Sequence, residues 1–156
     1  MYHHRFALLA LGIFTLACTT TYTINQPRVL HPCAWAQDGD PQIAAMGALI
    51  MAMQDNKWNI IQGSAEHGFV RAEACRRAFC GSVDAYIDRG GGIEIFASPN
   101  QELYPNEVEV LEGWLHKLDR RYEIYRCEVP PNHVDLVEGL YMPSESVPPK
   151  PVAEGT

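Results

Sequence analysis

Apolar and polar residues alternate along three segments in the middle of the chain, and each segment predicts a half-buried β-strand. The segments are residues 69–75, 80–88 and 93–97. In each of them, small or branched apolar residues occupy every second position. Residues 58–65 predict a fourth strand, and the glycines at 90–92 suit a tight reversal because glycine tolerates positive φ. The sequence therefore predicts a four-stranded antiparallel meander with one apolar face.

Two segments with a helical period flank the predicted strands. Asp40 and Pro41 suit the N-cap and the first turn of a helix, and apolar residues follow at spacings of three and four until about residue 55. A second helix is predicted from about residue 105. Its apolar side consists of Val108, Leu111, Leu115, Leu118 and Tyr122.

Both helices are expected to cover the apolar face of the sheet. That face consists of Val70, Ala72, Ala74, Val83, Ala85, Ile87, Ile93, Ile95 and Ala97. The predicted fold class is therefore α+β: a four-stranded antiparallel meander with an N-terminal and a C-terminal helix packed on one face, in the order α-β-β-β-β-α. It forms one small domain at residues 40–127.

Residues 1–17 have the features of an export signal. The apolar run follows Arg5, and at about 11 residues it is too short for a membrane span, which needs roughly 20. Thr15-Leu16-Ala17-Cys18 resembles the lipobox of bacterial lipoproteins, in which the cysteine becomes the lipidated first residue of the mature chain. Thr15 stands where that motif usually has Leu, and Thr15 with Ala17 also satisfies an ordinary secretory cleavage site.

The five cysteines are an odd number, which leaves one thiol unpaired in an exported protein. Lipidation of Cys18 would leave four cysteines for two disulfides in an oxidising compartment. Cys75 and Cys80 bracket a hairpin connection and so face each other across adjacent strands, which predicts a disulfide. Cys33 and Cys127 would then pair, although four cysteines allow three connectivities.

These features predict a protein of the cell envelope, held on the periplasmic side by a lipid at Cys18. Thr19, rather than Asp, follows the cysteine, and by resemblance to bacterial sorting signals this implies the outer membrane. A secreted, soluble periplasmic protein is the alternative. Residues 18–39 predict a lipidated cysteine and a Thr-rich tether, because they show no apolar periodicity.

Composition and charge limit the partners of the mature chain. Residues 128–156 hold six of the 11 prolines and five acidic residues, which predicts a disordered tail. Without Arg5 the mature chain carries 11 Lys and Arg against 19 Asp and Glu. This excess of acidic residues argues against a nucleic-acid partner, which needs a basic surface to neutralise phosphates.

No pattern in the sequence predicts catalysis, a metal or a cofactor. The mature histidines are scattered and none has metal-ligand spacing to another histidine or to a cysteine. No Ser-His-Asp order, nucleophile elbow or phosphate loop is visible. We therefore predict a binding or structural accessory domain that is not an enzyme, and the alternative is a small enzyme with an unrecognised site.

The outer face of the predicted sheet is the best candidate for a binding surface. On that face Tyr86 and Phe96 are expected to lie exposed among four charged residues, Arg71, Glu73, Asp84 and Glu94. Aromatic side chains ringed by charges can mark a protein contact, although scattered surface aromatics are common. We expect a protein of the envelope as the partner.

One further set of residues bears on the class of protein. It consists of Lys57 before Trp58, Gly68-Phe69-Val70-Arg71-Ala72, Arg77, the turn from Ser98 to Leu103, and Trp114-Leu115 with Leu118 and Tyr122. Their order across residues 43–122 resembles a family of small bacterial lipoproteins of uncharacterised function. The chain departs from that family at Leu111, where an aromatic is usual, and at Phe79, where a histidine is common. The resemblance implies an anchored periplasmic α+β domain without an assigned reaction.

Overall fold

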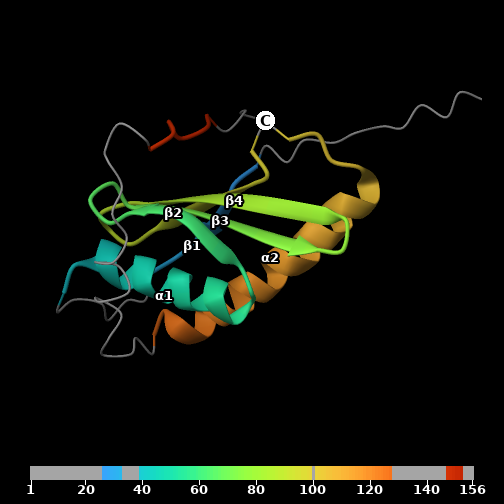
Figure 1. The fold of residues 1–156 in the computed structure, drawn as a ribbon. Helices are drawn as coiled ribbons and strands as arrows, with labels where there is room; N and C mark the ends of the chain where they lie inside the picture. The colour runs from blue at the N-terminus through green and yellow to red at the C-terminus, as the bar shows by residue number, and fades with distance from the viewer. Residues whose placement is uncertain (1–25, 33–38, 100, 128–146, 153–156) are drawn as a thin grey trace, which may run out of the picture.

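A five-stranded antiparallel sheet with two helices on one face forms the structure (Figure 1). The computed structural model describes residues 26–32, 39–99, 101–127 and 147–152. Its elements are β1 (Arg28–Leu30), α1 (Pro41–Asp55), β2 (Asn59–Ser64), β3 (Phe69–Arg76), β4 (Phe79–Ile87), β5 (Ile93–Ala97) and α2 (Pro105–Tyr125). The strand order is β1-β5-β4-β3-β2, so α1 carries the chain from one edge of the sheet to the other.

The α+β class, both helices and the four-stranded meander are confirmed, and strand β1 is a correction. β1 lies within residues 18–39, which the sequence predicted as a tether. Arg28 pairs with Ile95 and Leu30 with Ile93, so β1 extends the sheet beyond β5. Three residues are too few to show a period of two, and β1 depends on the edge of β5 for its hydrogen bonds.

Arg28 also ties β1 to α2, which makes this part of the predicted tether a part of the domain. Its guanidinium contacts the carboxylates of Glu112 and Asp119, and the contact to Asp119 is 2.5 Å long. Burial raises the pKa of Asp119, and the charge of Arg28 opposes that shift. A residue predicted to lie between membrane and domain therefore holds the edge strand against the second helix.

α1 begins and ends close to the positions that the sequence predicts. The Oδ1 of Asp40 accepts hydrogen bonds from the backbone N–H groups of Gln42 (2.9 Å) and Ile43 (3.5 Å), which satisfies donors that a helix leaves unpaired. Asn56 ends the helix, and Lys57 follows with a φ of 64°. The fully buried large side chains of α1 are Met46, Leu49, Ile50 and Met53. No helix in the described part of the chain is long and apolar enough to cross a membrane.

The core lies between the sheet and the two helices, and the predicted inner face is confirmed. All nine inner-face residues, from Val70 to Ala97, are buried. From the helix side, Leu111, Leu115, Leu118 and Tyr122 are at most 1% exposed. Trp58 meets Trp114 edge to face, with ring centroids 6.1 Å apart. The small alanines of β3 and β4 let the helices lie close to the sheet.

The tight reversal between β4 and β5 lies where the glycines predict it. The Asp88 carboxylate accepts hydrogen bonds from the backbone N–H groups of Gly90 (2.8 Å) and Gly92 (2.9 Å). Gly91 between them has a φ of 83°, a conformation that favours glycine. This turn fixes the register in which β5 lies beside β4.

Residues 147–152 lie on the other side of the sheet from the helices, where Figure 1 shows them in red. Pro148 and Pro149 contact Tyr86, and Lys150 contacts Glu94. Of the predicted disordered tail, residues 128–156, the structure describes only this short segment, which lacks helix and strand and contacts the sheet. Residues 128–146 and 153–156 lie outside the described part of the chain.

Candidate functional site

The outer face of the sheet is defined here as six side chains on β3, β4 and β5. They are Phe69, Arg71, Asp84, Tyr86, Glu94 and Phe96. The register sets them in two rows across the strands: Phe69 beside Tyr86 beside Glu94, and Arg71 beside Asp84 beside Phe96. Because neighbouring residues in a row point to the same side, the three strands present one continuous surface.

Three aromatic rings form the apolar part of the outer face. The ring centroids of Phe69 and Tyr86 are 5.2 Å apart, and those of Tyr86 and Phe96 are 5.8 Å apart in a T-shaped contact. Phe69 is 0% exposed and Phe96 is 2% exposed, whereas Tyr86 keeps an intermediate exposure. Tyr86 therefore links the other two rings and offers its hydroxyl to whatever lies above them.

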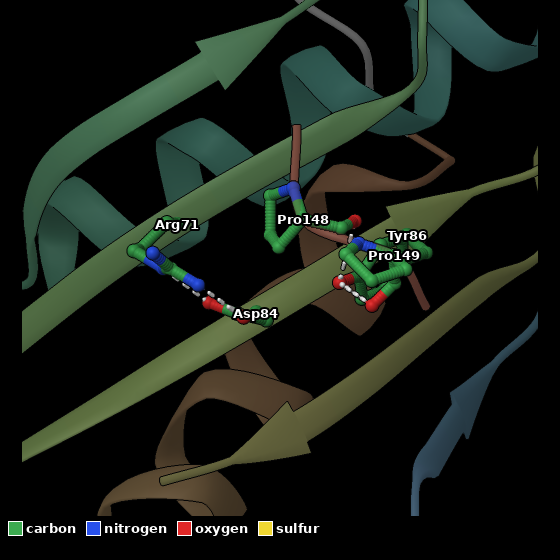
Figure 2. A network of polar contacts seen from close by, with 5 residues as sticks. All are labelled: Arg71, Asp84, Tyr86, Pro148 and Pro149. Atoms are coloured by element: carbon green, nitrogen blue, oxygen red, sulfur yellow. Dashed lines mark hydrogen bonds and ion pairs between the residues drawn. The ribbon is translucent and has the colours of Figure 1, made fainter. Parts of the chain in front are cut away.

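A bidentate ion pair forms the charged part. The Nε and Nη2 groups of Arg71 each donate to one carboxylate oxygen of Asp84 at 2.6 Å (Figure 2). The Asp84 side chain is 4% exposed and that of Arg71 is 35% exposed, so the carboxylate is buried and the guanidinium reaches solvent. The hydrogen bonds to Asp84 raise the pKa of Arg71, although burial opposes the shift. The planar fork of Arg71 is thereby held in place beside the aromatic rings.

The chain's own residues 148–150 cover part of this surface, where they contact Tyr86 and Glu94. The Tyr86 hydroxyl lies 3.3 Å from the carbonyl oxygens of both Pro148 and Pro149 and can donate to either (Figure 2). The Nζ of Lys150 lies 2.7 Å from the Glu94 carboxylate. Burial raises the pKa of Tyr86, and the charge of Asp84 adds to this shift. The outer face is thus occupied by a Pro-Pro-Lys segment.

The structure brings four of the predicted surface residues together and corrects their exposure. Arg71, Tyr86, Glu94 and Phe96 are neighbours on adjacent strands. Phe96, however, is buried, because the Tyr86 ring packs on its edge and the face is covered. Sequence reasoning also placed Asp84 on this face, and the structure confirms that position; it missed one member of the face, Phe69. It also missed the cover of the face, residues 148–150.

The cysteines that the structure describes are all in disulfides. Cys75 and Cys80 are bonded to each other across β3 and β4, as predicted. Cys127 is disulfide-bonded as well. Its predicted partner Cys33, like Cys18, lies outside the described residues, so that pairing stays a prediction.

Two other groups of polar side chains do not form a reactive site. Glu73 lies near Cys75 and Cys80, but the sulfurs of those cysteines are bonded to each other and offer no thiolate to a metal. Ser64 Oγ lies 2.9 Å from Nδ1 of His67 and accepts the His67 backbone N–H. Since Ser64 is only 2% exposed, its hydroxyl stabilises the turn after β2 and is closed to a substrate, whereas His67 is exposed.

A shallow basic depression lies between the end of α1 and α2, with a volume of about 430 Å³. It is lined by Asn56, Lys117, Arg120, Arg121 and Ile124. Arg121 is 3.4 Å from Asp55, and no described residue forms an ion pair with Lys117 or Arg120. All three basic side chains are exposed, which is typical of solvated surface.

Comparison with known proteins yields no relative: no protein-family model and no curated protein matches this sequence. The resemblance to small bacterial lipoproteins therefore rests only on the residues quoted for it. In the structure most of those residues serve the fold. Trp58, Val70 and Leu115 are in the core, and Gly68 has a φ of 57° in the turn before β3.

Proposed function

We propose that this protein is a lipid-anchored binding domain of the cell envelope and that the outer face is its contact surface. The observation that carries the proposal is the outer face itself, where an aromatic cluster stands beside a fixed guanidinium. An antiparallel sheet needs a covering layer on one side only, and here both described helices cover the inner side. Tyrosine, phenylalanine and arginine are the residue types enriched in protein contacts.

The disulfides support the compartment in this proposal. Cys75–Cys80 is a disulfide between exposed residues, and Cys127 is also disulfide-bonded. Disulfides persist outside the reducing cytosol, as in the bacterial periplasm. With the predicted export signal, this favours a periplasmic domain, and we propose a lipid at Cys18 as its anchor and the outer membrane as its location.

For the enzyme alternative the described residues offer two candidate sites: the Ser64–His67 pair, and a depression of about 500 Å³ whose lining includes Asp40, Glu66 and Arg89. A catalytic site needs polar groups that converge on a cavity open to substrate. In the first the Ser64 hydroxyl is buried, and in the second the Asp40 carboxylate caps α1, so neither presents a free pair of reacting groups. We therefore propose binding as the single function.

Fractionation of cells tests the anchor. The variant Cys18→Ala lacks the thiol that would carry the lipid, so we expect it to move from the membrane fraction to the soluble periplasmic fraction. A variant at the neighbouring Thr19, Thr19→Ser, keeps the thiol and serves as the control. Unchanged membrane association of Cys18→Ala would remove the lipid anchor from the proposal.

Photo-cross-linking in intact cells tests the contact surface. A photoreactive residue at Glu73 lies on β3 at the margin of the outer face, whereas one at Glu109 lies on the exposed side of α2. We expect discrete adducts with envelope proteins from position 73 and none of these from position 109. Equal adduct patterns, or no adducts at either position, would contradict the outer face as the contact surface.

A further inference from the structure

The outer face carries the features of a site for an extended Pro-Pro-Lys segment. We propose that a partner protein presents such a segment, proline-rich and followed by a lysine or arginine, and that residues 148–150 hold the same site intramolecularly. This inference rests on the proposed binding function and adds the chemical class of the ligand.

The hydrogen bonds explain the two prolines. The Tyr86 hydroxyl lies at 3.3 Å from two successive carbonyl oxygens, those of Pro148 and Pro149. Proline has no backbone N–H, and a polyproline II segment makes no internal hydrogen bonds, so its carbonyl oxygens remain free to accept. Aromatic surfaces with a polar edge recognise proline-rich segments in this way, because the stiff segment loses little entropy on binding. Tyr86 supplies both the ring and the donor.

The charges explain the lysine. Arg71 is paired with Asp84 through two hydrogen bonds, so the positive charge of the outer face is already neutralised. The carboxylate beside Tyr86 is that of Glu94, its cross-strand neighbour, and Lys150 pairs with it. A segment that sets its proline carbonyls over β4 therefore sets its next side chain over β5, where a cation is favoured. In the direction in which residues 148–150 cross the sheet, from Tyr86 on β4 to Glu94 on β5, the order Pro-Pro-cation matches the order of the strands.

The contact with residues 148–150 is of a kind that a partner can replace. It consists of long hydrogen bonds to a single hydroxyl and an ion pair whose side chains are 48% and 36% exposed. Such contacts are weak individually. Residues 148–150 belong to the same chain as Tyr86, so they act at an effective concentration that does not depend on the protein concentration. A partner segment that binds more tightly than this displaces it.

Peptide binding to the full mature chain tests the inference. The probe is a labelled synthetic peptide with the sequence of residues 146–152, and binding is followed by fluorescence anisotropy. The tail variant Pro148→Ser/Pro149→Ser/Lys150→Ala frees the face, so we expect it to bind the peptide about five- to tenfold more tightly than the wild-type chain. Equal affinity for both chains, or no binding to the tail variant, would overturn the inference.

Two variants of the outer face, each made in the tail variant, test whether the peptide binds through the proposed hydrogen bond and ion pair. Tyr86→Phe keeps the ring and removes the donor, and we expect about a fivefold loss of affinity. Glu94→Lys should lose at least as much and recover with a peptide that carries Lys150→Glu. Glu73→Lys is the matched control, because it makes the same charge change on the same side of the sheet but on β3, at the margin of the outer face. Losses in the face variants no larger than in this control would reject the site.

The outcomes separate this inference from the proposed function. A circular dichroism melt confirms that each variant folds before binding is compared. Adducts at position 73 without peptide binding would reject the ligand class and leave the contact surface standing. A second copy of this chain is the competing occupant. If the wild-type chain elutes as a dimer and the tail variant as a monomer, the segment binds between copies and the partner proposal fails.

Discussion

Adjacent residues on the two faces of the sheet can be buried to nearly the same degree by different means. Ile95 and Phe96 are adjacent in β5 and are 1% and 2% exposed, but Ile95 points to the helices and Phe96 to the outer face. The inner face is covered by two helices with apolar sides. The outer face is covered in part by a short segment that touches it through carbonyl oxygens and one ammonium group. Burial alone therefore does not distinguish a structural face from a recognition face.

The difference lies in what can replace each cover. Water cannot replace the apolar contacts of the inner face without a loss of free energy that grows with the exposed area. Water or another peptide can replace the hydrogen bonds to Tyr86 at little cost, because the exchanged bonds are similar. We therefore expect the contacts of the inner face to determine the free energy of unfolding. The contacts of residues 148–150 are expected to determine only whether the outer face is free or occupied.

The largest expected effect is on the inner face. Trp58 is 4% exposed and Leu115 is 1% exposed, so Trp58→Ala and Leu115→Ala each leave a cavity in the core. We expect each to lower the free energy of unfolding by roughly 2–5 kcal/mol in a denaturant titration. Val110→Ala on the same helix, where Val110 is 42% exposed, is the control and should change stability little. A small effect of Leu115→Ala would mean that the helices do not cover the sheet.

The second largest effect is expected from the Arg71–Asp84 ion pair of the outer face. Arg71→Met leaves the buried Asp84 carboxylate without its partner, and we expect a loss of roughly 2–4 kcal/mol at neutral pH. The exposed Arg120→Met is the control, since no described residue pairs with Arg120. The double variant Arg71→Met/Asp84→Asn removes the unpaired charge and should recover part of the loss. An unchanged free energy of unfolding in Arg71→Met would mean that the ion pair does not stabilise the fold and that water can replace it.

The inner face was predictable because a period of two identifies the apolar parity of each strand. The same reasoning could have found more of the outer face. If Cys75 faces Cys80, the antiparallel register also sets Arg71 opposite Asp84 and Phe69 opposite Tyr86. The predicted disulfide therefore fixes a strand register from which the ion pair and the first aromatic contact could have been predicted.

The remaining features depend on contacts that no local pattern encodes. β1 has three residues and acquires its partner from β5, which is distant in sequence. The position of residues 148–150 depends on one hydroxyl and one carboxylate on two other strands. Proline-rich composition predicts a chain without a core of its own, and that holds equally for a disordered tail and for a docked segment. Only the folded surface distinguishes the two.

Two tyrosines on opposite faces give a smaller effect that depends on pH. The Tyr122 hydroxyl is buried with no hydrogen-bond partner among the described residues, whereas that of Tyr86 has two acceptors. Burial raises the pKa of Tyr122 from 10.0 to about 12. A raised folded-state pKa gives stability that is present below pH 10 and is lost as the pH rises to about 12, by roughly 2–3 kcal/mol.

The variant Tyr122→Phe tests this alkaline loss. It should flatten the fall in unfolding free energy between about pH 10 and 12, and at neutral pH it should be as stable as the wild-type chain, because no hydrogen bond is removed. Tyr104→Phe, at a side chain that is 49% exposed, should keep the wild-type pH profile. A large loss of stability at neutral pH in Tyr122→Phe would show that its hydroxyl has a partner after all.

The smallest expected effect is that of removing the outer cover. Deletion of residues 147–156 removes the contacts to Tyr86 and Glu94, and we expect it to cost less than about 1 kcal/mol of unfolding free energy, because exposed ion pairs and exchangeable hydrogen bonds contribute little. Its clearer effect should be on ionisation. Burial raises the pKa of Tyr86, so uncovering the phenol should lower that pKa toward its ordinary value.

Absorbance titration of tyrosinate in the full and the deleted chain measures this shift, and the same pair of chains with Tyr86→Phe is the control in which the difference should vanish. A lower pKa of Tyr86 together with a nearly unchanged unfolding free energy would mean that the segment covers the face without holding the fold, as an exchangeable occupant must. A loss of several kcal/mol on deletion would instead make residues 147–156 a structural layer, and the two faces of the sheet would then be covered in the same sense.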